Sequence, residues 1–198
     1  IPTHNKMVII GFSGKMGCGK NYLAESIVLP FLKSRGYQVL VIAFADQLKI
    51  DCMAKYGLTY SAVFEEKTPI TRTILQQEGT ENGRDKRGAD VWIKYVANWI
   101  QIFSARGIDH FLITDVRFHN EAEWIKQQNG IIIKIDAPDR HITHCSARNI
   151  SIERQYHSSE TELDNWTNFD IIVDNTESNT ENVKNQLLDA LSMLRVAN

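Results

Sequence analysis

Residues 14–21 read GKMGCGKN, which has the GxxxxGK spacing of a phosphate-binding loop. Glycines allow such a loop to turn so that several backbone N–H groups point at one anion. A helix beginning near Lys20 would direct its partial positive charge to the same place, and Lys20 would reach the outer phosphates of a nucleotide. We therefore expect nucleotide contacts from Gly14, Lys15, Gly17, Cys18, Gly19, Lys20 and Asn21.

The loop closes on Asn21, where a Ser or Thr hydroxyl usually binds magnesium. An amide oxygen is a neutral ligand, so a carboxylate would also be needed to hold Mg²⁺. Asp115 ends the apolar run 110–115 and is our candidate for this carboxylate, with a helix cap or a solvated turn as the alternative. Arg117 follows two residues later and is predicted to hold a phosphate group, unless it forms a surface salt bridge.

The chain predicts an α/β fold with three layers, in which helices cover both faces of a five-stranded parallel sheet. Ile- and Val-rich runs bounded by Gly, Asp or Pro are typical of buried strands. These runs span 7–12, 38–44, 110–115, 131–136 and 169–174. Helical spacing covers 21–35, 92–103, 120–128 and 180–194. We expect one domain over residues 1–198, with two polar excursions, 46–90 and 138–165.

The composition limits the classes of partner. The chain has 198 residues, of which 43% are hydrophobic, and its formal net charge is only −2. This charge argues against nucleic acid as a partner, and no apolar run is long enough for a membrane span. Three cysteines without CxxC spacing favour a reducing compartment, so we expect a cytoplasmic protein.

Taken together, FSGKMGCGKN, ITDVRFHNEAEWIKQQNGIIIKI, HSSETELD and FDIIVDN resemble the deoxynucleoside monophosphate kinases of phages and large DNA viruses. The resemblance extends from residue 8 to about 175, and its most specific parts are DVRFHNE (115–121) and LQQEGTENGR (75–84). Members of that family often have Asp after the loop lysine, so Asn21 is a departure. The order of segments also resembles animal-type phosphomevalonate kinases, with their glycine loop, D-x-R strand end and late SE-x-x-LD.

The resemblance implies a P-loop kinase fold and an enzyme that uses ATP and Mg²⁺ to phosphorylate small-molecule nucleotides. It implies that 46–90 binds the monophosphate acceptor and that 138–165 is a lid over the donor phosphates. Related kinases are often dimers, so a homodimer is one expectation, and a viral protein would work in the host cytoplasm. A phosphomevalonate kinase and a nucleotide-binding protein without catalysis remain the alternatives.

The acceptor-binding segment and the lid each offer candidate residues. The acceptor side is predicted to use Asp46, Lys49, Arg72, Gln76, Gly79, Thr80, Arg84, Trp92 and Arg117. An exposed helix explains Arg72 and Gln76 about as well. Trp92 begins a segment with helical spacing, and a Trp in such a segment is more often part of a core. The lid offers Arg140, as a catalytic group, and Arg148, Arg154, His157 and Glu160. A solvated charged loop is the alternative for its arginines. Asn175, after the last strand, is predicted to contact the adenine of the donor.

Overall fold

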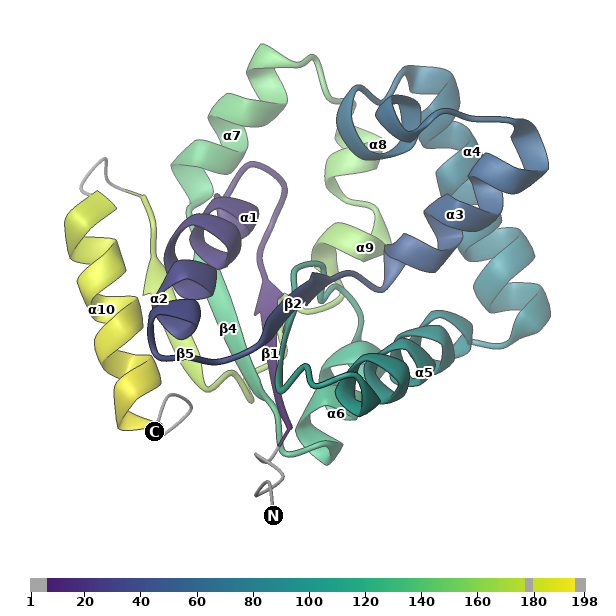
Figure 1. Cartoon of the computed structure of the whole chain (residues 1–198). Helices are drawn as coiled ribbons and strands as arrows, with labels where there is room; N and C mark the ends of the chain where they lie inside the picture. Colours follow the sequence, from purple (N-terminus) through teal and green to yellow (C-terminus); the bar gives the residue numbers. More distant parts are fainter. Residues whose placement is uncertain (1–6, 177–179, 195–198) are drawn as a thin grey trace. The chain divides into compact units, whose positions relative to one another are not determined.

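The fold is described from a computed structural model that covers residues 7–176 and 180–194. Five strands form one parallel sheet in the order β2-β3-β1-β4-β5, and Figure 1 labels β1, β2, β4 and β5. The strands are β1 (Val8–Ser13), β2 (Val39–Ile42), β3 (His110–Ile113), β4 (Ile131–Asp136) and β5 (Ile171–Asp174). The predicted five-stranded parallel sheet is therefore confirmed, and each strand begins within its predicted run.

The central strand β1 pairs with β3 on one side and with β4 on the other. Its register places Val8 opposite His110 and Ser13 opposite Lys134. Because the paired strands are parallel, their carboxyl ends lie at the same edge of the sheet, and in such sheets ligands bind at that edge. The glycine loop leaves β1 at this edge.

Helices cover both faces of the sheet, as predicted. On one face, Ile10 and Phe12 of β1 belong to a buried cluster with Leu23, Val28 and Leu187. These last three lie on the helix after the loop and on α10 (Thr180–Met193). On the other face, Ile125 of α6 (His119–Gln127) lies over Gly11 of β1. Alternate residues of β1 thus face opposite layers, as the pleat of a strand requires.

The helix after the loop contains a π-helical turn. It consists of α1 (Lys20–Tyr22), the π-helical η1 (Leu23–Val28) and α2 (Leu29–Ser34), within the predicted range 21–35. The widened turn ends with a hydrogen bond from the Leu29 N–H to the Ala24 carbonyl. Pro30 follows directly, and its ring would clash with a carbonyl four residues earlier in a regular α-helix. The π turn relieves that clash.

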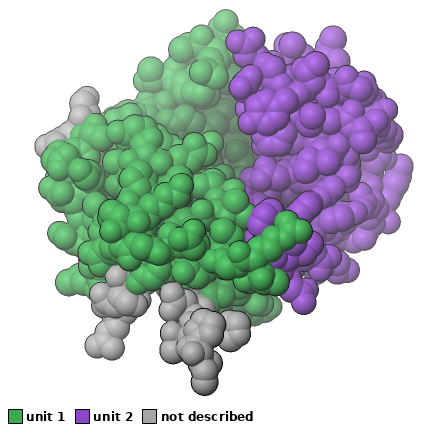
Figure 2. Space-filling view, viewed as in Figure 1, with its two compact units in different colours: residues 1–41, 104–198 green, residues 42–103 purple. Residues whose placement is uncertain are grey.

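The chain divides into two compact units, coloured separately in Figure 2. Unit 1 comprises residues 1–41 and 104–198 and carries the sheet, whereas unit 2 comprises residues 42–103. The helices that lie in unit 2 are α3 (Ala45–Tyr56), η2 (Ser61–Glu65), α4 (Pro69–Gly79), η3 (Thr80–Asp85) and most of α5 (Val91–Ala105). The segment 46–90, predicted to be polar and helical, forms most of this unit.

The second polar segment, 138–165, is also helical and belongs to unit 1. It contains α7 (Pro138–Ala147), α8 (Ile152–Gln155) and α9 (Ser158–Thr161). Within the described ranges, no helix is both long and apolar enough to cross a membrane.

Candidate phosphate-binding site

Two glycines of the loop adopt backbone conformations that other residues rarely take. Gly17 has φ 77° and Gly19, which precedes α1, has φ 91°. A Cβ atom on Gly17 would lie 2.5 Å from the Cβ of His144, and one on Gly19 would lie 2.7 Å from the Asn175 side-chain nitrogen. Both positions therefore require glycine, for conformation and for space.

Asn175, which follows the edge strand β5, connects the glycine loop to the end of β4. Its side chain is buried, and its Nδ2 donates a hydrogen bond of 2.9 Å to the Cys18 carbonyl. Its backbone N–H donates to the Asp136 carbonyl at 2.8 Å. Asn175 thus fixes the backbone of the glycine loop, and its contact with adenine stays a prediction.

Lys20 is buried at the start of the helix, with 8% of its surface exposed. Burial lowers the pKa of its ammonium group, and the nearby positive charge of Arg117 lowers it further. The negative charges of Glu160 and Asp115 act in the opposite direction. An anion arriving at this lysine would meet a cation with little competing water.

The backbone at Arg117 is held by Glu121, a buried residue of α6. The Glu121 Oε2 accepts hydrogen bonds from the N–H groups of Arg117 at 2.8 Å and Phe118 at 3.1 Å. The preceding residue, Val116, donates its N–H to the Phe12 carbonyl at 3.1 Å. These bonds tie the turn after β3 to both the central strand and α6, so the direction of Arg117 is fixed by its surroundings.

The guanidinium of Arg117 forms an ion pair with the carboxylate of Glu160 on α9. Burial favours the neutral form of Arg117, but Glu160 outweighs burial and the pKa of Arg117 is raised. For Glu160, burial would raise the pKa, but the charge of Arg117 and the Met16 N–H outweigh it and the pKa is lowered. Both groups are therefore charged at neutral pH.

The loop itself also contacts Glu160. Its Oε2 accepts a hydrogen bond of 2.9 Å from the Met16 N–H. The Lys15 Nζ donates to the Glu160 carbonyl at 2.9 Å and pairs with the Asp164 carboxylate at 2.8 Å. On the other side of the loop, His141 of α7 lies 2.9 Å from the Met16 carbonyl oxygen. Segment 138–165 therefore lies against the glycine loop in this structure.

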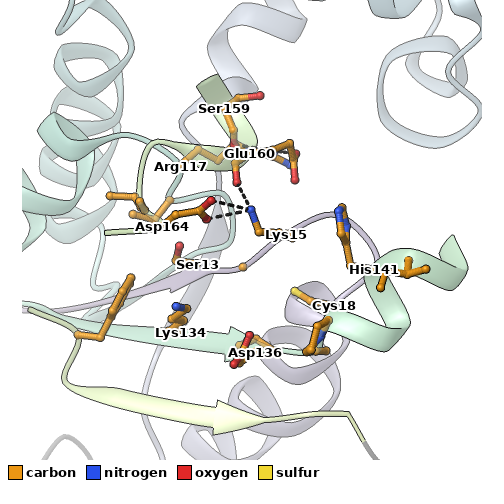
Figure 3. Close-up of a pocket in the computed structure, with 18 residues that line it drawn as sticks. Ser13, Lys15, Cys18, Arg117, Lys134, Asp136, His141, Ser159, Glu160 and Asp164 are labelled. Carbon is orange, nitrogen blue, oxygen red and sulfur yellow. Dashed lines mark hydrogen bonds and ion pairs between the residues drawn. The ribbon is translucent and has the colours of Figure 1, made fainter. Parts of the chain in front are cut away.

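A cavity of about 240 Å³ opens beside the loop. Figure 3 shows Lys15 directed at the Asp164 carboxylate, with Lys134 and Asp136 projecting from β4. Sequence reasoning did not identify Ser13, Lys134, Asp136, His141, Ser159 and Asp164 as part of this site. The alternation along β4 could have identified Lys134 and Asp136, since they are polar residues at the carboxyl end of a buried strand.

The predicted magnesium ligands are oxygen donors of suitable type. Asn21 is exposed on α1, directly after Lys20. Asp115 follows β3, and its charge acts on both Lys20 and Arg117. No group of three or more His, Cys, Asp or Glu side chains suited to a metal occurs in the described part of the chain. The two donors fit an ion that takes its other ligands from phosphates and water, as Mg²⁺ usually does.

The remaining lid candidates lie along 138–165. Arg140 is half-buried on α7, Arg148 is exposed at the end of that helix, and Arg154 is half-buried on α8. His157 precedes α9, and its Nδ1 accepts a hydrogen bond of 3.2 Å from the Ser159 N–H. His157 thereby orders the turn that carries Glu160.

The acceptor candidates other than Arg117 all belong to unit 2. Asp46 and Lys49 lie on α3, where the Asp46 carboxylate accepts a hydrogen bond from the Ala43 N–H at 2.9 Å. Lys49 lies over the ring of Phe64, 4.4 Å from its centroid. Arg72 donates to the Lys67 carbonyl at 3.2 Å.

The rest of this group lies on α4, η3 and α5. Gln76 is exposed on α4, whereas Thr80 and Arg84 are half-buried on η3. Trp92 is buried, with 3% of its surface exposed, and its indole N–H donates to the Gly79 carbonyl at 3.0 Å. The core role that the sequence left open for Trp92 fits this burial.

Comparison with known proteins supports the resemblance to deoxynucleoside monophosphate kinases. No family model matches the chain. A mimivirus protein named "Putative deoxynucleotide monophosphate kinase" is 28% identical over 193 residues, covering 87% of this chain and 90% of its own length. The resemblance inferred from the sequence is confirmed by this similarity.

Solved structures show the fold. The APS kinase CysC of Mycobacterium tuberculosis, in complex with AMPPNP and APS, aligns with a TM-score of 0.52 at 12% identity. That alignment covers 94% of this chain and 98% of the other. The chain has a P-loop kinase fold. TT1252 from Thermus thermophilus also aligns, with a TM-score of 0.57 at 17% identity, covering 96% of this chain and 98% of TT1252. In the P-loop kinase fold, the glycine loop after the first strand is the phosphate-binding element.

Proposed function

We propose that this chain transfers the γ-phosphate of ATP to (deoxy)nucleoside monophosphates and releases diphosphates, with Mg²⁺ as cofactor. The proposal rests above all on the buried Lys20 and the adjacent Arg117, two cations at the mouth of a glycine loop. The similarity to the mimivirus protein supplies the substrate class.

In the proposed reaction, an oxygen of the acceptor monophosphate attacks the γ-phosphorus. The bond between that phosphorus and the β–γ bridging oxygen breaks, and ADP leaves with the electron pair. Because both reactants are polyanions, the protein mainly has to position them and neutralise charge. Lys20 takes the donor side and Arg117 the acceptor side. When bound, Mg²⁺ supplies further neutralisation, and Asn21 and Asp115 are the side chains that would hold it.

Two further parts of the proposal concern the polar segments. Residues of 46–90 supply the contacts to the acceptor, and 138–165 acts as the lid, with Arg140, Arg148 and Arg154 available to the donor phosphates. Arginine suits both tasks because its planar fork binds phosphate oxygens in pairs.

A substrate panel tests the proposal. ATP consumption is measured with dTMP, dGMP, dCMP and dAMP, and in parallel with phosphomevalonate. We expect turnover with at least one nucleotide and none with phosphomevalonate. Turnover with phosphomevalonate alone would assign the chain to the isoprenoid reaction instead. ATP binding without turnover on any acceptor would favour a nucleotide-binding protein without catalysis.

A variant pair links the activity to the loop. Lys20→Ala is expected to reduce kcat by about 10²-fold or more, because it removes the buried cation beside the phosphates. Lys33→Ala, at an exposed lysine of α2, serves as the matched control. Circular dichroism of both variants checks that the fold is retained. Full activity of Lys20→Ala would remove the loop from the mechanism.

A further inference from the structure

The Glu160 carboxylate lies among groups that would attract a phosphate. Only 3% of its side chain is exposed. One oxygen pairs with Arg117, and the other accepts the Met16 N–H at 2.9 Å. Lys20 is close enough for the two charges to shift each other's pKa. A carboxylate thus contacts a loop N–H and an arginine, the two kinds of donor that bind phosphate oxygens in proteins.

The charge balance at this point changes when a nucleotide arrives. A triphosphate brings several negative charges to the same loop, where Glu160 already contributes one. In a site with little water, like charges at close range repel strongly. Glu160 also already accepts the Met16 N–H of the loop and lies within the electrostatic reach of Lys20. The buried carboxylate and the donor phosphates therefore compete for the same loop N–H and the same lysine.

The element that carries Glu160 is short, and the polar bonds to Ser159 and Glu160 come from the glycine loop and from Arg117. This element is α9, a helix of four residues. Its neighbours are fixed by the exposed ion pair of Lys15 with Asp164 and by the bond from the His119 N–H to Glu162, at 3.0 Å. Contacts of this kind contribute little stability when they are exposed to solvent. The bonds to Ser159 and Glu160 couple the position of segment 157–164 to the glycine loop and to Arg117.

We propose that Glu160 is an internal competitor of the nucleotide: its carboxylate occupies an anion position at the glycine loop, and a phosphate of the bound nucleotide displaces it. Displacement frees the Met16 N–H and Lys20 for the donor phosphates and Arg117 for the acceptor, and it releases segment 157–164 from the loop. The inference rests on the proposed nucleotide binding at this loop. It adds that binding is opposed by a charge that the protein itself supplies.

The test is a substitution that neutralises the Glu160 side chain. Glu160→Gln keeps the size of the side chain and can still accept the Met16 N–H, but it removes the negative charge. We expect its Kd for ADP and for tripolyphosphate, measured by calorimetry, to fall by about tenfold. Tripolyphosphate has no base or sugar, so it reports on the phosphate site alone. Glu153→Gln, at an exposed position of α8, is the matched control and should change either Kd by less than about twofold.

A second readout follows segment 157–164 directly. Hydrogen exchange of its backbone amides should become faster when ADP is added to the unmodified protein, because the proposal releases the segment from the loop. In Glu160→Gln the exchange without ADP should already approach the value that the unmodified protein shows with ADP. A structural role for Glu160 would predict weaker ligand binding in Glu160→Gln together with a lower Tm, and that result would overturn the proposal.

The outcomes also separate this inference from the proposed function. If the unmodified protein phosphorylates nucleotides and Glu160→Gln binds ADP no more tightly, only the competitor role is lost. If Glu160→Gln binds tripolyphosphate more tightly but no acceptor is phosphorylated, the competitor role stands and the proposed reaction is wrong. Absence of ADP and tripolyphosphate binding in both proteins would refute both.

Discussion

The side-chain amide of Asn175 donates a hydrogen bond to the Cys18 carbonyl, across 157 positions of sequence. Cys18 lies within the glycine loop, and Asn175 follows the edge strand β5 directly. Because both residues are buried, the bond is shielded from water. The loop is therefore held by the last strand as well as by the helix that follows it.

Asn175→Ala is expected to lower stability and ATP affinity together. Loss of one buried hydrogen bond costs about 1–2 kcal/mol, which corresponds to a Tm decrease of about 2–8 °C in a chain of this size. Thermal unfolding and calorimetric titration with ATP measure the two effects. Asn168→Ala, at an exposed position before β5, is the control. An unchanged ATP affinity in Asn175→Ala would show that the loop keeps its shape without this bond.

Arg117→Ala is expected to lower use of the acceptor strongly, and ATP binding should stay largely intact once the charge of Glu160 is also removed. Loss of one cation at the transferring phosphate typically lowers kcat by about 10²- to 10³-fold. The variant also leaves Glu160 buried without its partner, at a cost of about 1–3 kcal/mol. The double variant Arg117→Ala/Glu160→Gln removes that cost, so it separates stability from catalysis. A failure of ATP binding in the double variant would contradict the assignment of Arg117 to the acceptor.

Glu121→Gln tests whether the backbone bonds at Arg117 position its side chain. The amide is a weaker acceptor than the carboxylate for the two N–H groups it receives. We expect kcat/KM for the acceptor to fall by about tenfold and KM for ATP to change by less than about twofold. A merely structural role would instead lower Tm and affect both substrates equally.

Asn21→Asp should lower the Mg²⁺ concentration needed for half-maximal activity. The substitution replaces a neutral oxygen donor with a carboxylate, which magnesium prefers. Asn21 is exposed, so the fold should tolerate the change. Asn98→Asp adds the same charge at an exposed position of unit 2 and controls for net charge. An identical magnesium requirement in all three proteins would remove Asn21 from the metal site.

ATP binding should take up protons at alkaline pH. Burial and Arg117 lower the pKa of Lys20 in the free protein, whereas a bound phosphate would raise it. Affinity should therefore be greatest below the lowered pKa and fall as pH rises through it, because a deprotonated lysine must gain a proton to bind. Calorimetry in buffers of different ionisation enthalpy measures this uptake. Lys20→Arg should abolish it, since arginine stays charged, and an equal uptake in that variant would point to another group.

The sheet could be predicted from the sequence because its strands are buried on both faces. Such strands appear as continuous apolar runs, and Gly, Asp or Pro marks their ends. The same reasoning places Lys20 and Arg117, since each lies within a few residues of a strand end. Glu121 could also have been found, because a glutamate in the first turn of a helix commonly accepts preceding N–H groups.

The contacts of Glu160 and Asn175 could not be predicted in this way. Arg117 and Glu160 are 43 positions apart, and no periodicity relates them. Their meeting depends on how 138–165 folds back over the strand ends, and this segment has only short helices. Local patterns predict an element and the face it buries, whereas such contacts depend on tertiary packing.

The division of the chain has a consequence for how substrate range can evolve. The backbone passes between the two units only after residue 41 and after residue 103. Residues 42–103 are therefore a single uninterrupted insert, and recombination at two points would exchange all of it. If this insert supplies the acceptor contacts as proposed, an ancestor could acquire a different acceptor preference in one step, while the glycine loop and Lys20 remained untouched.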